Sequence, residues 1–144
     1  MAIRPVLAVL AVALVIGCAS THQVVRLPDQ TKTVEDPSKA RIYVVRPTFV
    51  AGAISMKVTD GEQEIGKTGA NGYLCWERTP GETTIKSKAE NTATLPLKTE
   101  AGVVYYVQQH IRIGILFARN KLSLLTPQEG TEALKKCKPP QVER

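Results

Sequence analysis

The sequence predicts a mainly β protein: a small antiparallel β-sandwich of the transthyretin or immunoglobulin type with a short C-terminal helix. Short apolar runs, several of them alternating with polar residues, recur along residues 40–125. Turn signals separate these runs, among them the dipeptides at 60–61, 80–81 and 101–102. Strands at intervals of about ten residues with turns between them are typical of sandwiches. Beyond this region the apolar residues change to helical spacing.

The first predicted strand is the run 42–45, Ile-Tyr-Val-Val, whose continuous apolar character suits a central strand. Another strand is predicted over residues 72–78. Its side chains alternate between two faces because successive residues of a strand point in opposite directions. One face carries Leu74 and Trp76, and the other carries Tyr73 and Cys75.

Between these strands lies a predicted hairpin around residues 60–61, Asp-Gly, a dipeptide that favours the positive φ angles of a two-residue turn. Pairing across this turn sets Lys57 opposite Glu64 and Met56 opposite Ile65. One face of the hairpin then carries an opposite-charge pair, and the other carries two apolar side chains. Both arrangements stabilise paired strands, so they support this register.

The remaining strands are predicted by shorter patterns. The segment 83–88 follows a turn, and the segment 95–97 has a proline at its centre, which suggests an edge strand. The longest alternating pattern covers residues 103–113. Two shorter runs, 115–118 and 122–125, follow it, and a turn at the intervening asparagine is expected to join them.

The C-terminal helix is predicted by its first residues. Thr126 is a good N-cap, Pro127 suits the first helical position, and Glu129 completes a capping box. Gly130 weakens the helix, so a short one is expected. Apolar residues then follow at helical spacing, namely Ala133, Leu134 and Cys137.

The first 17 residues predict a signal peptide. Arg4 precedes an apolar stretch over 5–17, which has the length of a secretory leader and is too short to span a bilayer as a helix. The run 15–18, Val-Ile-Gly-Cys, resembles a bacterial lipobox, although Ile16 replaces the usual small residue. This resemblance implies cleavage before Cys18 and acylation of its thiol. The alternatives are secretion without a lipid and a short buried helix.

Acyl chains on Cys18 would anchor the protein to a membrane. Ala19 is not the aspartate that retains such proteins at the inner membrane, so the inner leaflet of the outer membrane, facing the periplasm, is the expected location. Residues 18–38 are polar and carry two prolines, which predicts a tether spanning about 25 Å as a flexible coil. The domain itself is predicted over 39–138, with a tail at 139–144.

The net positive charge of the chain indicates which classes of partner it can bind. The chain has 19 basic and 13 acidic side chains, of which only Arg4 lies in the leader, so five positive charges remain in excess after cleavage. Such a domain can favour anionic lipid head groups, lipopolysaccharide phosphates or the cell-wall polymer. Nucleic acid is not expected as a partner, because the basic residues are scattered and no interleaved aromatic patch accompanies them.

Two cysteines remain besides Cys18. Cys75 and Cys137 are predicted to form a disulfide because the periplasm is oxidising. A loop of roughly 60 residues closed in this way stabilises by about 4 kcal/mol in the chain-entropy model. The alternative is two separate thiols. No metal site and no cofactor is expected, because the cysteines have no neighbouring ligands at metal-binding spacing.

Six short segments carry a resemblance to a known family. They are 40–47 (Ala-Arg-Ile-Tyr-Val-Val-Arg-Pro), 65–67 (Ile-Gly-Lys), 71–73 (Asn-Gly-Tyr), 80–82 (Pro-Gly-Glu), 101–107 (Ala-Gly-Val-Val-Tyr-Tyr-Val) and 134–138 (Leu-Lys-Lys-Cys-Lys). In their order and spacing they resemble an uncharacterised family of bacterial lipoproteins, the domain of unknown function 2846, over about residues 39–138, essentially the whole predicted domain. The resemblance implies a small β-sandwich on a lipid anchor and brings no activity with it.

An enzyme is not expected. His22 and His110 are the two histidines, and no carboxylate close in sequence could orient either as a base. The sequence therefore predicts a non-catalytic binding or scaffold module for another envelope protein or cell-wall glycan. Its candidate contacts are Arg41, Arg46, His110 and Arg112, and each is alternatively an ordinary solvated group. The alternatives are a structural or stress-related envelope lipoprotein without a discrete site and, by analogy of fold, an accessory lipoprotein of a secretion system.

Overall fold

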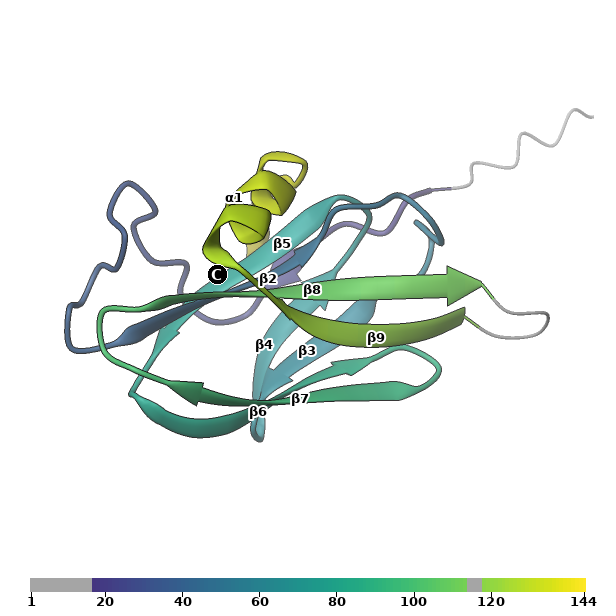
Figure 1. Cartoon of the computed structure of the whole chain (residues 1–144). Helices are drawn as coiled ribbons and strands as arrows, with labels where there is room; N and C mark the ends of the chain where they lie inside the picture. Colours follow the sequence, from purple (N-terminus) through teal and green to yellow (C-terminus); the bar gives the residue numbers. More distant parts are fainter. Residues whose placement is uncertain (1–16, 114–117) are drawn as a thin grey trace, which may run out of the picture.

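In the computed structural model, which describes residues 17–113 and 118–144, two β-sheets pack face to face as a sandwich with one short helix (Figure 1). The six-stranded sheet has the order β10-β1-β4-β3-β6-β7, and the four-stranded sheet has the order β5-β2-β8-β9. The strands are β1 (His22–Gln23), β2 (Ala40–Arg46), β3 (Met56–Asp60), β4 (Gln63–Thr68), β5 (Gly72–Arg78), β6 (Gly81–Lys88), β7 (Thr92–Thr99), β8 (Val104–Ile113), β9 (Ala118–Leu125) and β10 (Gln141–Val142).

The predicted fold class is confirmed, with one difference in strand direction. β2 pairs antiparallel with β5 but parallel with β8, and β1 pairs parallel with β10. A parallel neighbour needs a crossover connection, and the chain between β2 and β8 provides one by passing through the other sheet. Both β2 and β8 therefore end at the same end of the sandwich, so the chain leaves Arg46 and Ile113 in the same direction.

The core lies between the two sheets and is built from alternate residues of each strand. Ile42 and Val44 of β2 contact Leu74 and Trp76 of β5 there, as the alternation predicts. A second apolar cluster lies on the outer face of the four-stranded sheet, under the helix α1 (Pro127–Lys135). β2 is buried on both faces, which explains its continuous apolar run.

The helix begins as predicted. Thr126 accepts a hydrogen bond from the Glu129 backbone, and the Glu129 side chain accepts one from the Thr126 backbone, so the capping box is complete. Gly130 has a role that the sequence did not reveal. A Cβ at this position would lie 2.1 Å from Cγ of Tyr106, so the glycine lets the helix approach the sheet closely. Within the described residues no helix is long and apolar enough to cross a membrane.

The predicted register of the first hairpin is wrong. The turn residues are Gly61 and Glu62, so Asp60 pairs with Gln63, and a bulge follows between Val58 and Thr59. The bulge brings Val58 opposite Gly66. The expected ion pair between Lys57 and Glu64 nevertheless forms across the strands at 3.5 Å. Met56 and Ile65 are both fully buried, although they are not directly paired.

Three further expectations concern the ends of strands. β7 is an edge strand with Pro96 exposed, as predicted. Asn120 lies inside β9 rather than in a turn, because its side chain pairs with Asn91 across the sandwich. The prediction that residues 139–144 form a tail is wrong, since β10 forms there beside β1.

Two predicted segments cannot be compared with the structure. Residues 1–16 of the predicted signal peptide and residues 115–117 of the predicted run 115–118 lie outside the described residues.

Candidate functional site

The chain that follows Cys18 packs on the sandwich. β1 enters the six-stranded sheet between β10 and β4, and Thr21 is buried and accepts a hydrogen bond from the Gly69 backbone at 2.9 Å. Val25 contacts the inner core, and Leu27 contacts the cluster under the helix. The predicted flexible tether is therefore wrong, since the segment that leaves Cys18 is part of the fold.

Three glycines at three-residue spacing make room for this segment. A Cβ on Gly66, Gly69 or Gly72 would lie between 1.7 and 2.1 Å from an atom of residues 19–22. No other amino acid allows such close approach, because a real Cβ does not come within 3 Å of these atoms. The chain from Ala19 onward is thus laid over the β4–β5 connection.

Gln23 fixes the same segment to the second sheet. Its side-chain nitrogen donates to the Cys75 carbonyl at 2.7 Å, and its side-chain oxygen accepts from the Cys75 N–H at 3.0 Å. Cys75 lies on β5, the edge of the four-stranded sheet, so the fully buried amide takes the place of a neighbouring strand. The edge of β5 is therefore closed to pairing with another strand at Cys75.

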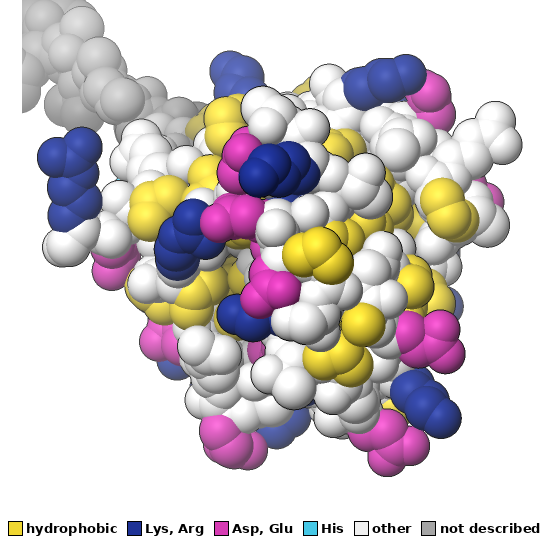
Figure 2. Space-filling model, turned by 90° about the vertical axis from the view of Figure 1, so that its left-hand side faces the viewer, with side chains coloured by type: hydrophobic (Ala, Val, Ile, Leu, Met, Phe, Trp, Pro, Cys, Tyr) yellow, Lys and Arg dark blue, Asp and Glu magenta, His cyan; other side chains and the backbone are white. Residues whose placement is uncertain are grey.

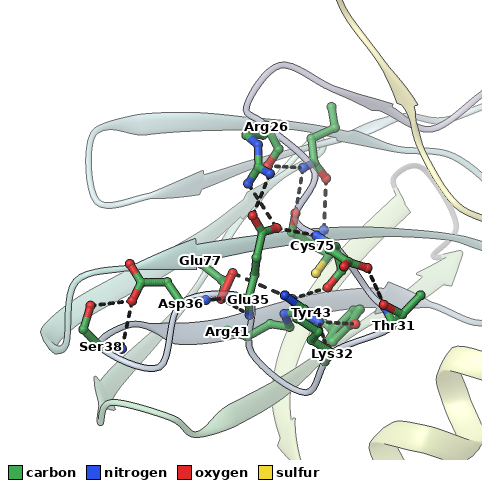
Figure 3. Close-up of polar contacts among 12 residues, drawn as sticks. Arg26, Thr31, Lys32, Glu35, Asp36, Ser38, Arg41, Tyr43, Cys75 and Glu77 are labelled. Carbon is green, nitrogen blue, oxygen red and sulfur yellow. Dashed lines mark hydrogen bonds and ion pairs between the residues drawn. The ribbon is translucent and has the colours of Figure 1, made fainter.

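Arg41 is not a surface contact residue, contrary to the prediction. Its guanidinium is 1% exposed and donates to the carbonyls of Asp29 and Lys32 at 2.8 and 2.7 Å. Glu77 lies 3.7 Å away and also accepts from the backbone N–H of Glu35 (Figure 3). The charge of Arg41 is thereby satisfied inside the protein, where it orders the loop between β1 and β2.

Arg46 is also buried and is also wrong as a predicted contact. Its guanidinium is fully buried and donates to the carbonyls of Ile54 and Thr68 at 2.6 and 3.1 Å, and to that of Ala51 at 2.9 Å. Because burial disfavours the charged form, the pKa of this guanidinium is lowered from its usual value. Arg46 therefore organises the loop between β2 and β3 from inside.

The predicted disulfide between Cys75 and Cys137 is absent from the structure, which has both as free thiols. Lys138 forms a parallel bridge with Gly72, three positions before Cys75 in the sequence, and the Cys137 N–H donates to the Leu134 carbonyl at the end of the helix. Both cysteines belong to the cluster under the helix, where burial raises the pKa of the Cys75 thiol to about 12 and that of the Cys137 thiol to about 11.

His110 and Arg112 do lie at the surface, on the outer face of β8. Arg112 pairs directly with Arg119 of β9, and His110 pairs with Lys121. The two pairs point to the same face because they are two residues apart. Like charges directly opposite destabilise a strand pair, so the Arg112–Arg119 pair is costly without an anionic contact. Among the described residues, none of these four side chains takes part in an ion pair.

We call these four residues, His110, Arg112, Arg119 and Lys121, the cationic hairpin face. It continues the outer face of the four-stranded sheet beyond the part that the helix covers. They line a surface pocket together with Ser123, whose hydroxyl lies 2.7 Å from His110 Nε2. Partial burial, followed by the charges of Lys121 and Arg112, lowers the pKa of His110 from its usual value.

The described residues contain no group of three or more histidine, cysteine, aspartate or glutamate side chains that could hold a metal ion. His110 has a serine and two cations as neighbours, an environment that offers no carboxylate to orient it as a base. His22 lies in β1 and reaches no nucleophile among the hydrogen bonds of the described chain.

Sequence reasoning missed two buried polar residues. One is Gln23, whose partner is 52 residues away. The other is Asp60, expected in a turn, whose carboxylate accepts from the Trp76 indole at 2.9 Å and from Arg78 Nε at 3.0 Å. It also missed Arg119 and Lys121, because their pairing with β8 emerges only from the strand register.

The comparisons with known proteins agree with this architecture. Residues 36–119 match the family model described as "Protein of unknown function (DUF2846)". An uncharacterised protein of Haemophilus influenzae is 23% identical over 133 residues, which cover 89% of this chain and 79% of that protein. The family model covers more than half of the chain, including the strands from β2 to the start of β9. The chain therefore belongs to the DUF2846 family.

Proposed function

We propose that the protein is a lipid-anchored protein of the cell envelope, held on the inner leaflet of the outer membrane. In this proposal it acts as a non-catalytic binding or scaffold module facing the periplasm. The lipobox-like run before Cys18 supports the anchor, and the side chain of Cys18 is exposed and free for acylation. The leader would be removed on processing.

The observation that carries the binding role is the cationic hairpin face. Arg112 and Arg119 lie directly opposite each other as a like-charge pair, at a cost to the strand pairing, and His110 and Lys121 form the adjacent pair. Such a cost is offset when an anionic group binds there. Carboxylates on another envelope protein or on cell-wall glycan have the matching chemistry. The mature chain also has a net positive charge, which attracts such partners.

The anchor is tested by the intact mass of the protein extracted from membranes. An N-terminus at Cys18 carrying acyl mass is expected, and the Cys18→Ala variant should remain as an unprocessed precursor. A mature, soluble protein from that variant would refute the anchor. This test does not depend on the identity of any partner.

The binding role is tested by mild cross-linking in cells followed by purification. The wild type should capture a stoichiometric envelope partner that the Lys121→Glu variant loses. Lys98→Glu, an exposed charge reversal on β7, is the matched control and should retain it. Equal capture by all three proteins would exclude the cationic hairpin face. Absence of any partner would favour the second candidate, a structural or stress-related envelope lipoprotein, which the burial of Arg41 and Arg46 also favours.

A further inference from the structure

We propose that the end of the sandwich carrying Cys18 lies directly on the membrane surface, with Phe49 and Ile113 inserted at the level of the lipid chains. The inference rests on the proposed lipid at Cys18 and adds an orientation to it. It replaces the picture of a domain held off the bilayer by a tether of about 25 Å.

The chain is held on the domain directly after Cys18. The Ala19 N–H donates to the Gly52 carbonyl at 2.7 Å, so the chain is fixed one residue beyond the cysteine. A Cβ on Gly52 would lie 3.3 Å from Cys18 Sγ and 3.1 Å from the Phe49 carbonyl. The atom that would carry the lipid is therefore a neighbour of the Phe49 backbone. A bilayer that holds the lipid must lie against this part of the domain.

The loop that follows β2 exposes two apolar side chains. Phe49 is 75% exposed, and the adjacent Val50 is 41% exposed. The loop is nevertheless held in place, because Arg46 donates from inside to the carbonyls of Ala51 and Ile54 at 2.9 and 2.6 Å. The exposed Phe49 side chain is therefore carried by a loop whose backbone is fixed by hydrogen bonds from Arg46.

Ile113, at the end of β8, is also strongly exposed, at 67%. β2 and β8 run parallel with Val45 beside Gln108, so β8 continues in the direction of the loop that follows Arg46. Figure 1 shows the purple start of the described chain at the end toward which the β8 arrow points. Cys18, Phe49 and Ile113 therefore lie at one end of the sandwich.

The distribution of exposed apolar side chains supports this surface. Phe49 and Ile113 are the two most exposed large hydrophobic residues of the described chain, and the next, Leu124, is 50% exposed. Exposed apolar side chains gathered around a lipid attachment point fit the acyl region of a bilayer, which rewards apolar area. An isolated exposed leucine elsewhere needs no such explanation.

The charges next to these residues suit lipid head groups. Arg112 and Arg119 are both exposed and directly precede and follow the apolar end of the hairpin at Ile113 and Ala118. Basic side chains beside inserted apolar ones are attracted to anionic head groups. In this orientation the pair nearest to Ile113, Arg112 and Arg119, faces the head groups, and the adjacent pair, His110 and Lys121, remains available to a partner's carboxylate. The opposite end of the sandwich, shown in Figure 2, carries basic and acidic side chains intermixed, an arrangement that lacks this one-sided attraction.

The test measures the depth of three positions in lipid. The variants Phe49→Trp, Ile113→Trp and Val103→Trp are prepared as the full lipoprotein, processed in cells and reconstituted into vesicles of phosphatidylethanolamine and phosphatidylglycerol with brominated acyl chains. Val103 is the matched control, since it is 37% exposed just before β8, at the opposite end of the same strand. The native Trp76 is 3% exposed in the core and gives a constant background.

We expect bromine to quench the emission of the tryptophans at positions 49 and 113 by roughly two-fold or more and to leave position 103 unchanged. Equal emission of all three in an acylated protein would overturn the orientation while leaving the anchor intact. An absence of acyl mass on the purified protein would overturn the anchor and the orientation together. The intact mass therefore separates the two failures.

A second measurement tests the head-group contact. The Arg112→Glu, Arg119→Glu double variant in the Ile113→Trp background should show less quenching than Ile113→Trp alone, and the difference should disappear in vesicles without phosphatidylglycerol. Lys98→Glu, a charge reversal on β7 near the opposite end, is the control and should leave quenching unchanged. A loss of quenching that is equal for the double variant and the control would contradict a specific contact.

Discussion

Gln23 binds both backbone polar atoms of Cys75, donating to its carbonyl at 2.7 Å and accepting from its N–H at 3.0 Å. The two residues belong to different sheets, so one side chain joins the edge of the four-stranded sheet to β1. Because Gln23 follows Cys18 by five residues, this pair also connects the proposed lipid attachment point to the core of the sandwich.

Replacing Gln23 by alanine should lower the free energy of unfolding by about 2–4 kcal/mol, because two buried backbone groups of Cys75 lose their partners. Urea denaturation of the variant measures this change. Gln63→Ala, an exposed glutamine on β4, is the control and should stay within about 0.5 kcal/mol of the wild type. Equal effects of both substitutions would contradict the role of the Gln23–Cys75 pair.

The substitution Gly69→Ala should release the segment before β1. Its Cβ would lie 1.8 Å from the Ala19 carbonyl oxygen, so the segment must move away. Hydrogen exchange should then show loss of protection at residues 21–23, while the amides of β2 stay protected as an internal control. Unchanged protection at Thr21 and Gln23 would show that the glycines are not needed for packing.

Local patterns in the sequence were sufficient for the elements that depend on neighbours in the chain. The strand over 72–78 and the capping box at Thr126 were predicted with the bounds and contacts that the structure has. Alternation and capping act within a few residues, so a single sequence carries them. The inner and outer faces of β5 also follow directly from alternation.

The errors arise where distant segments decide the structure. The hairpin register differs from the turn onward, and a bulge between Val58 and Thr59 then brings Val58 opposite Gly66, which also pairs with Gln23 of β1. The tether prediction failed because the partner of Gln23 lies 52 residues away. Arg41 and Arg46 looked like surface cations, yet each binds backbone carbonyls of loops, which have no pattern in the sequence.

The buried and exposed arginines should respond oppositely to removal. Arg41→Ala should cost about 3–5 kcal/mol of stability, because it leaves Glu77 buried without its cation and two carbonyls without a donor. Arg112→Ala should be neutral or slightly stabilising, since it removes a like-charge pair with Arg119. Thermal unfolding of both variants measures the contrast. A large loss in Arg112→Ala would show that this side chain has a structural role.

The two thiols should make the protein less stable at high pH. Burial raises the pKa of Cys75 to about 12 and that of Cys137 to about 11, whereas an unfolded thiol has a pKa of about 8.5. The folded state therefore holds more protons above pH 8.5, and the stabilisation present below that pH is lost as the pH rises toward 11–12. The slope is about 1.4 kcal/mol per pH unit for each thiol.

The Cys75→Ala, Cys137→Ala double variant is the control for this pH dependence, and urea denaturation between pH 7.5 and 10 is the measurement. The wild type should lose stability more steeply than the variant over this range. Alkylation in urea without a reductant should label both thiols of the wild type, because both are free in the folded protein. A protein that is labelled only after reduction would contain the disulfide, and the difference in slope between the two proteins would then be absent.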